Sequence, residues 1–591
     1  MVAHKPDEAV RNFDDVSGLQ ALSAHIHRQK IDAIVENSEI KNCFHVTYRV
    51  KESPKISIII STRDQAVVLK TCIDSILDKT SYLNYEIIIV DNQSADDNVI
   101  KYLSELVLVE PEKFKVIKYD EPFNFSAINN IAVEAASGEY VVLLNNDTMV
   151  LQEEWLQGML SQVQREEVGV VGVKLVYPNK TVQHAGIILG LGGVAGYPHA
   201  GIPMGSAGYM NRAIVSQNVS AVSAACMMVS KELYQQIGGL DANNLEVLFG
   251  DVDFCLRVKQ FGKKIVWTPY VTLIHYGAES LRQVTKNKAW DKQAEKEVES
   301  MLEKWMPELS NDRTYNRNLS LKSSDFQVDT SINLSWNERF RNKPKVYAFP
   351  LDSSGVGQYR VRGPVGALTR KGIIESSFAN NWDTITFPKS VEMERIAPDV
   401  LLMQNGFLDH MLTPWRQYRK FNSAFMVAGL DDIVYMLPSQ HPKQGVWPSN
   451  IRRKVKELFQ ISDRVVVANE ALKEEFSKMT ENIIVVPNYL ENWRWDSINQ
   501  PEKQKGKRLR VGWAGGSEHI SDLEFILPVV KMLHKEVDWV FMGLCLEELK
   551  PFVKEAYVGV DFNAYPQQLA NLNLDLAIAP LMHNKFNECK T

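Results

Sequence analysis

The fold is constrained most by a repeated alternation of short, continuous apolar runs with longer helical stretches. The first series consists of "KISIIIST" (55–62), "YEIIIVDN" (85–92), "FKVIKYD" (114–120), "YVVLLNND" (140–147) and "VGVVGVKLVY" (168–177). Strands that are apolar along their whole length and separated by helices are typical of a parallel sheet covered on both faces. The sequence therefore predicts an α/β fold.

The alternation stops in a polar stretch at 283–342 and then starts again. The second series consists of "KVYAFPL" (345–351), "DVLLMQN" (399–405), "SAFMVAG" (423–429), "DRVVVAN" (463–469) and "NIIVVPN" (482–488). After a polar segment at 500–508, the runs "LRVGWAGG", "VDWVFMG" and "LDLAIAP" begin a third sheet. A chain of 591 residues is too long for one core, so we expect several domains, with 286–342 as a helical and polar linker.

Charge and cysteine content restrict the possible partners and the compartment of the protein. A net charge of -6 argues against a nucleic-acid partner, because phosphate binding needs clustered Lys and Arg. The six cysteines lack the spacing of metal ligands and are typical of free thiols in a reducing compartment. The first fifteen residues have no apolar signal core, so we expect a cytoplasmic protein. The helical spacing in 18–35 fits a helix that packs on its neighbour, or else one that attaches to a membrane surface.

Polar side chains gather where the strands of the first series end. One strand ends in Ser61-Thr62-Arg63-Asp64, another in Asp91-Asn92, and a third in Asn145-Asn146-Asp147. The carboxyl ends of parallel strands meet at one edge of a sheet, where α/β folds bind their ligands. Each carboxylate alone could be a turn or a helix cap. No Gly-rich phosphate loop follows the first strand, so the phosphates of a nucleotide would need a metal.

A second group of acidic residues lies in 245–280. Asp251 and Asp253 open a helix with an apolar side, and His275 follows another apolar segment. The helix dipole favours an Asp in the first turn, which is the structural interpretation. A His and several carboxylates around a divalent cation would instead form a metal and base site.

The order of these motifs resembles the family 2 glycosyltransferases of the GT-A fold, particularly the large bacterial ones that build surface polysaccharides. The resemblance covers about residues 50–285 and rests on motifs such as "SIIIST", "IIIVDN", "PFNFSAINN", "VVLLNNDT", "VQHAGI", "GYPHAG", "FGDVDFCLRVKQFG" and "IHYGAES". It predicts a GT-A domain at 51–285 after a helical extension at 1–50.

The resemblance also implies roles for individual residues. Asp147 and His275 would hold Mn2+ or Mg2+, although Asn145 replaces the first Asp of the family's motif. Asp251 would be the general base of an inverting reaction, although Gly250 replaces the usual polar neighbour. The residues implied to bind the nucleotide-sugar are Thr62, Arg63, Asp64, Asp91, Asn130, Asn145 and Asn146. The residues placed in the acceptor region are Gln217, Asn218, Ser223 and Asp253. His184 and His199 are interpreted as structural.

The second half resembles the GT-B glycosyltransferases. We expect twin Rossmann-like lobes at 343–495 and 496–591, the second of them incomplete because relatives continue beyond "APLMHNKFNECKT". Two pairs of glycines would approach a ligand or else form tight turns: Gly355, Gly357, Gly515 and Gly516.

The sequence thus predicts an inverting, metal-dependent glycosyltransferase. By this resemblance it moves a sugar such as rhamnose from a dTDP- or UDP-linked donor to a glycan or lipid-linked glycan of the cell surface. It would work in the cytoplasm or at the inner face of the cytoplasmic membrane, and the GT-B half could be a second transferase. Two alternatives stay open, a carbohydrate-binding scaffold with a degenerate pocket and a nucleotidyltransferase.

Overall fold

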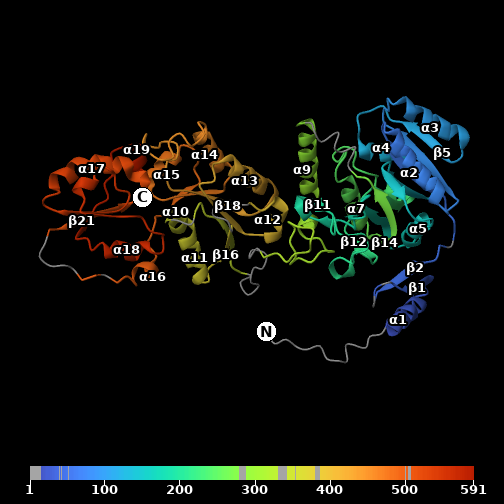
Figure 1. Cartoon of the computed structure of the whole chain (residues 1–591), viewed down its shortest axis with the longest axis horizontal. Coiled ribbons are helices and arrows are strands. Elements are labelled where there is room, and N and C mark those ends of the chain that lie inside the picture. The colour runs from blue at the N-terminus through green and yellow to red at the C-terminus, as the bar shows by residue number, and fades with distance from the viewer. Residues whose placement is uncertain are drawn as a thin grey trace. The chain divides into compact units, whose positions relative to one another are not determined.

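The computed structural model divides the chain into two compact units, residues 1–330 and 331–591. In Figure 1 the first unit runs from blue to yellow-green and the second from yellow to red. The structure describes residues 15–38, 40, 43–50, 52–277, 288–330, 342–352, 355–379, 387–499, 501–502 and 508–590.

The first unit is built on a ten-stranded sheet. The strands on its main path follow the order β12-β14-β8-β13-β6-β3-β4-β5, while β7 pairs with β14 and β9 with β8. Their bounds are β3 Ile56–Thr62, β4 Tyr85–Asp91, β5 Phe114–Lys118, β6 Tyr140–Asn145, β7 Thr148–Val150, β8 Val168–Val176, β9 Val182–His184, β12 Gln217–Val219, β13 Cys226–Ser230 and β14 Lys264–His275.

Along its main path the sheet is mostly parallel, and the parallel pairs include β8 with β14. Strands β6, β3, β4 and β5 are parallel, as the sequence predicts. β13 lies between β6 and β8 and is antiparallel to both, which fits the mostly parallel sheet that the resemblance implies. In this register Cys226 pairs with Leu144, so the residues just before β13 lie at the edge where β6 ends.

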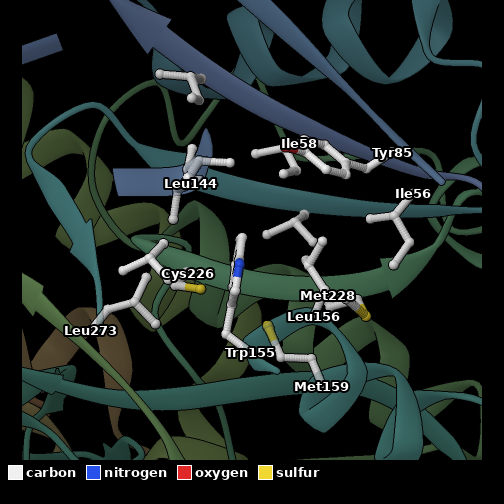
Figure 2. Packing of buried hydrophobic residues seen from close by; sticks show 14 of the residues in the cluster. Ile56, Ile58, Tyr85, Leu144, Trp155, Leu156, Met159, Cys226, Met228 and Leu273 are labelled. Carbon is white, nitrogen blue, oxygen red and sulfur yellow. The ribbon is translucent and has the colours of Figure 1, made fainter. Parts of the chain in front are cut away.

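Helices pack on the sheet and bury its apolar side chains. The bounds of these helices are α2 Ala66–Lys79, α3 Asp97–Val109, α4 Phe125–Ala135, α5 Trp155–Val163, α6 Lys231–Gln236 and α7 Gly250–Gln260. Figure 2 shows Trp155 and Met159 of α5 turned toward Cys226 and Met228 of β13. Trp155 is fully buried, and its indole N–H donates to Thr80 Oγ1 at 2.9 Å.

The segment expected as a linker belongs largely to the first unit. Helix α9 (Lys288–Ser310) and the residues up to 330 carry buried side chains. Phe326 stacks on Tyr209 with ring centroids 4.6 Å apart, and buried Asp312 accepts from the Leu189 amide at 2.8 Å. A free linker would leave such aromatic side chains in water, and the burial corrects that prediction for 288–330.

The N-terminal extension is only partly helical. Helix α1 (Asp15–Arg28) ends earlier than the expected 35, and β1 (Ala33–Asn37) forms an antiparallel pair with β2 (Phe44–Tyr48). Ile26 is the buried member of the apolar spacing in α1. Within the described part of the chain, no helix has both the length and the apolar character needed to cross a bilayer.

The second unit contains two parallel sheets. The first has the order β16-β15-β17-β18-β19-β20 and the second β23-β22-β21-β24, with every pair parallel. The strands are β15 Lys345–Phe349, β16 Glu375–Phe378, β17 Val400–Gln404, β18 Phe425–Leu430, β19 Arg464–Val467, β20 Ile483–Val485, β21 Arg510–Gly515, β22 Asp538–Gly543, β23 Glu555–Tyr557 and β24 Leu576–Ala577. The sequence patterns missed β16 and β23, which are short and half exposed.

Helices connect these strands, in agreement with the α/β prediction. Their bounds are α10 Gly355–Gly357, α11 Gly363–Arg370, α12 Ser390–Ile396, α13 Asp409–Phe421, α14 Ile451–Gln460, α15 Glu470–Phe476, α16 Asn492–Trp495, α17 Ile520–Leu533, α18 Tyr565–Asn571 and α19 Lys585–Glu588.

Candidate active site

A cleft of about 670 Å³ opens at the carboxyl ends of the strands in the first unit. Its lining comes from two stretches of the chain, 61–147 and 187–290. The first stretch supplies the ends of β3, β4 and β6, and the second supplies the residues before β13 and the start of α7. The strand ends therefore converge as the sequence predicts.

Asp147 and His275 meet in this cleft. Asp147 Oδ1 lies 3.0 Å from His275 Nε2, and its Oδ2 accepts from the Gly277 amide at 3.1 Å. The pairing of β7 with β14 explains the meeting, because Thr148 and His275 are partners in that ladder. The turn after β6 therefore places a carboxylate beside an imidazole from 128 residues further along the chain.

The hydrogen bonds of His275 define its tautomer. Nδ1 lies 2.6 Å from the side-chain amide oxygen of Gln183, which can only accept, so Nδ1 carries the proton. Nε2 accepts from the side-chain amide of Asn145 at 3.2 Å. In the neutral imidazole, Nε2 and Asp147 Oδ1 are then two acceptors facing each other, an arrangement that a bound divalent cation would stabilise.

Few of the described side chains are placed to ligate such a cation. No group of three or more His, Cys, Asp or Glu side chains suited to a metal ion occurs in the described ranges. The Asp147–His275 pair fits a cation that takes its remaining ligands from water and substrate phosphates, as Mg2+ usually does.

The loop after β3 forms another wall of the cleft. Asp64 and Gln65 both have left-handed backbones, with φ of 53° and 58°, which few non-glycine residues adopt. Asp64 Oδ1 accepts from the Ala95 and Asp96 amides at 2.7 and 2.9 Å and so joins this loop to the one after β4. Such strain is stored where a loop shape matters for function.

The end of β4 contributes Asn92 to the lining, with Asp91 behind it. Asp91 is buried, does not line the cleft, and accepts from the Ser94 amide at 3.1 Å. The Asn92 side-chain amide donates to the Tyr119 and Glu121 carbonyls, while its oxygen is buried with no partner among the described residues. A buried acceptor without a partner is a candidate contact for a ligand donor.

The remaining strand-end residues lie where the sequence places them. Thr62, Arg63, Asn145 and Asn146 all line the cleft. Asn146 donates to Thr62 Oγ1 at 3.2 Å, which joins the ends of β6 and β3.

Asp251 lies in the first turn of α7 and lines the cleft. Its Oδ2 accepts from the Ala224 amide at 3.0 Å and its Oδ1 from the Val252 amide at 2.8 Å. Burial raises the pKa of the Asp251 carboxyl, and the two amide bonds offset part of that increase. The same cleft raises the pKa of Tyr197 to about 12 through burial and the charge of Asp251.

Asn130 and Asp253 do not line the cleft and have partners elsewhere in the domain. Asn130 does not line the cleft, because its side-chain amide donates to the Leu240 carbonyl while its oxygen accepts from Tyr234 and from the Leu240 amide. Asp253 is fully buried away from the cleft. Its carboxylate binds Arg257, Lys304 and Trp305, so it joins α7 to α9.

The other residues predicted for the acceptor region also differ in whether they line the cleft. Ser223 lines the cleft with its neighbours Ala224 and Ala225. Gln217 and Asn218 lie in β12 opposite Trp267 and Val266 and do not line it.

The structure adds residues that the sequence did not indicate. Gln183 orients His275, and Trp290 of α9 lines the cleft. Glu297 of α9 is fully buried and accepts from the Val247 and Leu248 amides just before α7, and burial raises its pKa. The signal in the sequence was the position of Glu297, which at helical spacing falls in line with the apolar Ala294 and Met301.

His184 is buried and uses both ring nitrogens. Its Nδ1 lies 3.0 Å from the Val173 carbonyl, and its Nε2 accepts from the Ser223 amide at 3.2 Å. Burial lowers the pKa of His184 to about 4. His199 is also buried, and its ring packs tilted against Phe326 with centroids 4.5 Å apart. Burial lowers the pKa of His199 to about 4.

Two of the four glycines expected to approach a ligand in the second unit, Gly357 and Gly515, lie where backbone segments approach closely. A Cβ on Gly357 would lie 2.1 Å from the Asp352 carbonyl, and the Gly357 amide donates to Asp352 Oδ1. A Cβ on Gly543 would meet the Gly515 carbonyl at 2.1 Å, so the ends of β21 and β22 approach closely. Gly355 and Gly516 have room for a side chain.

Fold and cleft together define an α/β domain with a ligand site at the carboxyl edge of its parallel strands. Residues 57–238 match the family model "Glycosyl transferase family 2", so the chain contains a glycosyltransferase domain of this family. The resemblance predicted from the sequence motifs is confirmed over that range, whereas the GT-B resemblance of the second half stays a prediction.

Two curated proteins are similar to part of the chain. The uncharacterized protein y4gI of Sinorhizobium fredii is 38% identical over 54% of this chain and 35% of its own length. The O-antigen biosynthesis protein RfbC of Myxococcus xanthus is 38% identical over 45% of this chain and 20% of its own length. The matched region thus spans about a third or less of these relatives.

Solved structures are similar at low identity. GalNAc-T7 with UDP, GalNAc and Mn2+ has a TM-score of 0.34 at 15% identity, covering 43% of this chain and 52% of its own. The mannosyltransferase PcManGT of Pyrobaculum calidifontis, in complex with GDP-Man and Mn2+, has a TM-score of 0.32 at 14% identity, covering 49% and 72%.

Proposed function

We propose that the first unit catalyses inverting, divalent-metal-dependent transfer of a sugar from a nucleotide-sugar to a hydroxyl of a glycan or lipid-linked glycan. The observation that carries the proposal is the presence of two separate acidic groups in one cleft of a family 2 domain. Asp147 with His275 forms one group and Asp251 forms the other.

The Asp147–His275 pair would hold Mn2+ or Mg2+. A cation there neutralises the charge that grows on the departing diphosphate. The residues of the chain would do the rest of the positioning. Asn145 and Gln183 fix the ring of His275, while the Gly277 amide fixes the second oxygen of Asp147.

The nucleoside would lie against the loops after β3 and β4. Arg63 and Asp64 line this part of the cleft, and the Asn92 oxygen is an acceptor without a partner among the described residues. Uracil and thymine each have one ring N–H that such an acceptor can bind. UDP-hexoses and dTDP-rhamnose are therefore both suitable donors.

Asp251 would act as the general base. Its raised pKa makes the carboxylate a better proton acceptor. It would take the proton of the acceptor hydroxyl, whose oxygen attacks the anomeric carbon from the side opposite the diphosphate. A single displacement of this kind inverts the configuration at that carbon.

The similarity to an O-antigen biosynthesis protein supports a role in cell-surface polysaccharide synthesis. Such a role would place the protein at the cytoplasmic side of the membrane, in peripheral contact with a lipid-linked acceptor. The two parallel sheets of the second unit are compatible with a GT-B module and a second transfer step.

The first experiment is a panel of sugar nucleotides, each tested for thermal stabilisation and for hydrolysis with and without Mn2+. A donor that is bound and cleaved only with the cation supports the transferase. Binding of free sugars without any cleavage would favour the carbohydrate-binding scaffold. Pyrophosphate-dependent conversion of the nucleotide-sugar to a nucleoside triphosphate and a sugar 1-phosphate would favour a nucleotidyltransferase.

A further inference from the structure

We propose that His184 is a positioning residue that holds the loop Ser223–Ala225 so that the Ala224 amide points at the carboxylate of Asp251. This inference rests on the proposed role of Asp251 as general base. His184 itself does not line the cleft, so it would act only through the loop.

The contacts form a continuous chain from the sheet to Asp251. The Nδ1–H of His184 donates to the Val173 carbonyl of β8 at 3.0 Å, and its Nε2 accepts from the Ser223 amide at 3.2 Å. The next amide along the backbone, that of Ala224, donates to Asp251 Oδ2 at 3.0 Å. Each of these hydrogen bonds restricts the orientation of the next group in the chain.

The other end of the loop is fixed by β6. The Asn145 backbone amide donates to the Ala225 carbonyl at 3.1 Å, and the Ala225 amide lies 3.3 Å from Ser223 Oγ. Without His184 the Ser223 amide would lose its acceptor, while the Ser223 side chain would keep its contact with Tyr197 and the loop its attachment at Ala225. His184 is therefore the group that fixes the peptide plane before the Ala224 amide.

Histidine suits this place because a rigid ring offers a donor on one side and an acceptor on the other. A protonated ring would have no acceptor for the Ser223 amide. Burial keeps the ring neutral, since it is 1% exposed and its pKa is lowered to about 4. The titratable groups around it are Tyr197, whose ring meets it edge-on at 5.4 Å, and His275.

The test compares His184→Leu with His184→Gln in the full chain, using the pH dependence of kcat. Leu removes the acceptor at similar volume, whereas the Gln amide oxygen can reach the position of Nε2. Loss of the Ala224 bond raises the pKa of Asp251, so the acidic limb of the profile should move up by about one pH unit in His184→Leu. His184→Gln should restore most of the wild-type profile, with the donor KM unchanged in both variants.

Two other titratable side chains lie near Asp251 and have to be distinguished from it in the pH profile. Tyr197 and Cys255 are the titratable side chains that interact with Asp251, and both have raised pKa values in the cleft region. Neither titrates on the acidic limb. The Asp147–His275 pair is the same in the wild type and in both variants, so a shift of the limb in His184→Leu alone reports Asp251. An unshifted limb in His184→Leu, or equal shifts in both variants, would overturn the proposal.

A second measurement covers the case in which His184→Leu does not fold. In the wild-type protein with 15N-labelled histidine, His184 should show the neutral tautomer with the proton on Nδ1. It should not titrate between pH 5 and pH 8, because burial lowers its pKa to about 4. The other tautomer, or titration near neutral pH, would refute the contacts. These spectra need no activity, so a failure of His184 is distinguishable from an inactive Asp251→Asn or an inactive wild type.

Discussion

Replacing Asp251 with Asn tests the proposed mechanism most directly. The amide keeps the shape of the side chain but cannot take a proton, so kcat should fall by roughly 10²- to 10⁴-fold. Donor affinity should change little, because the cation pair of Asp147 and His275 is separate from this side chain. Since burial raises the pKa of Asp251, wild-type kcat should fall as pH drops through that raised value, and the variant should lose this dependence.

The structure also gives the cost in stability. Asp251 accepts two backbone amide bonds, and Asn can accept only one while its NH2 group faces the other amide donor. One unsatisfied backbone donor costs about 1–3 kcal/mol. Removing a charge whose pKa is raised by burial offsets part of this cost, because the ionised form is the one that burial disfavours.

Asp253→Asn is the matched control on the same helix turn. Asp253 is fully buried and pairs with Arg257 and Lys304, and removing its charge breaks both ion pairs. Breaking a buried pair of this kind costs about 3–5 kcal/mol. We therefore expect a stable and inactive Asp251→Asn, and a destabilised Asp253→Asn that retains turnover while folded.

The measurements are kcat with a verified acceptor, donor affinity by calorimetry and unfolding in urea. A near-normal kcat in Asp251→Asn would refute the role of general base. So would a loss of activity that follows the loss of stability in both variants to the same extent.

Three further predictions concern the cation, the unit boundary and the core. Asp147→Asn should abolish Mn2+-dependent donor binding without unfolding the protein, and an unchanged Mn2+ dependence in calorimetry would contradict the site. A fragment of residues 1–330 should fold and hydrolyse donor alone, whereas one ending at 310 should be unstable, because it lacks Asp312 and Phe326; comparing their melting temperatures checks this. Trp155→Ala should lower the free energy of unfolding by about 3–5 kcal/mol, and a loss below about 1 kcal/mol in urea titration would contradict the packing in Figure 2.

The strands and their acidic ends could be predicted because they depend on local pattern. An apolar run that stops at Asn145 or Asp91 places those residues at one edge whatever the details of packing. β16 and β23 lack that pattern, since both are short and half exposed. β13 was not among the predicted strands, and the apolar pattern of a strand does not reveal whether it pairs parallel or antiparallel with its neighbours.

The roles of single side chains depended on partners that are distant in sequence. Asp251 and Asp253 are two residues apart, which on a helix is about 200° of rotation, so they face opposite sides. The partners Lys304 and Trp305 of Asp253 lie in a segment expected to be a linker. Asn130 resembles a pocket residue by position, yet its bonds to Leu240 and Tyr234 depend on a turn that the motif does not describe.

The cleft is lined by two successive stretches of chain, 61–147 and 187–290. If the first stretch binds the donor and the second binds the acceptor and carries the base, the two specificities can evolve by exchange of segments. A chimera of two related proteins joined after β7 would take its donor specificity from one and its acceptor specificity from the other. It would need compatible contacts at the seam, chiefly Asp147 with His275 and Ser126 with the Leu245 carbonyl. Related chains could thus produce new glycan linkages by recombination without rebuilding either half.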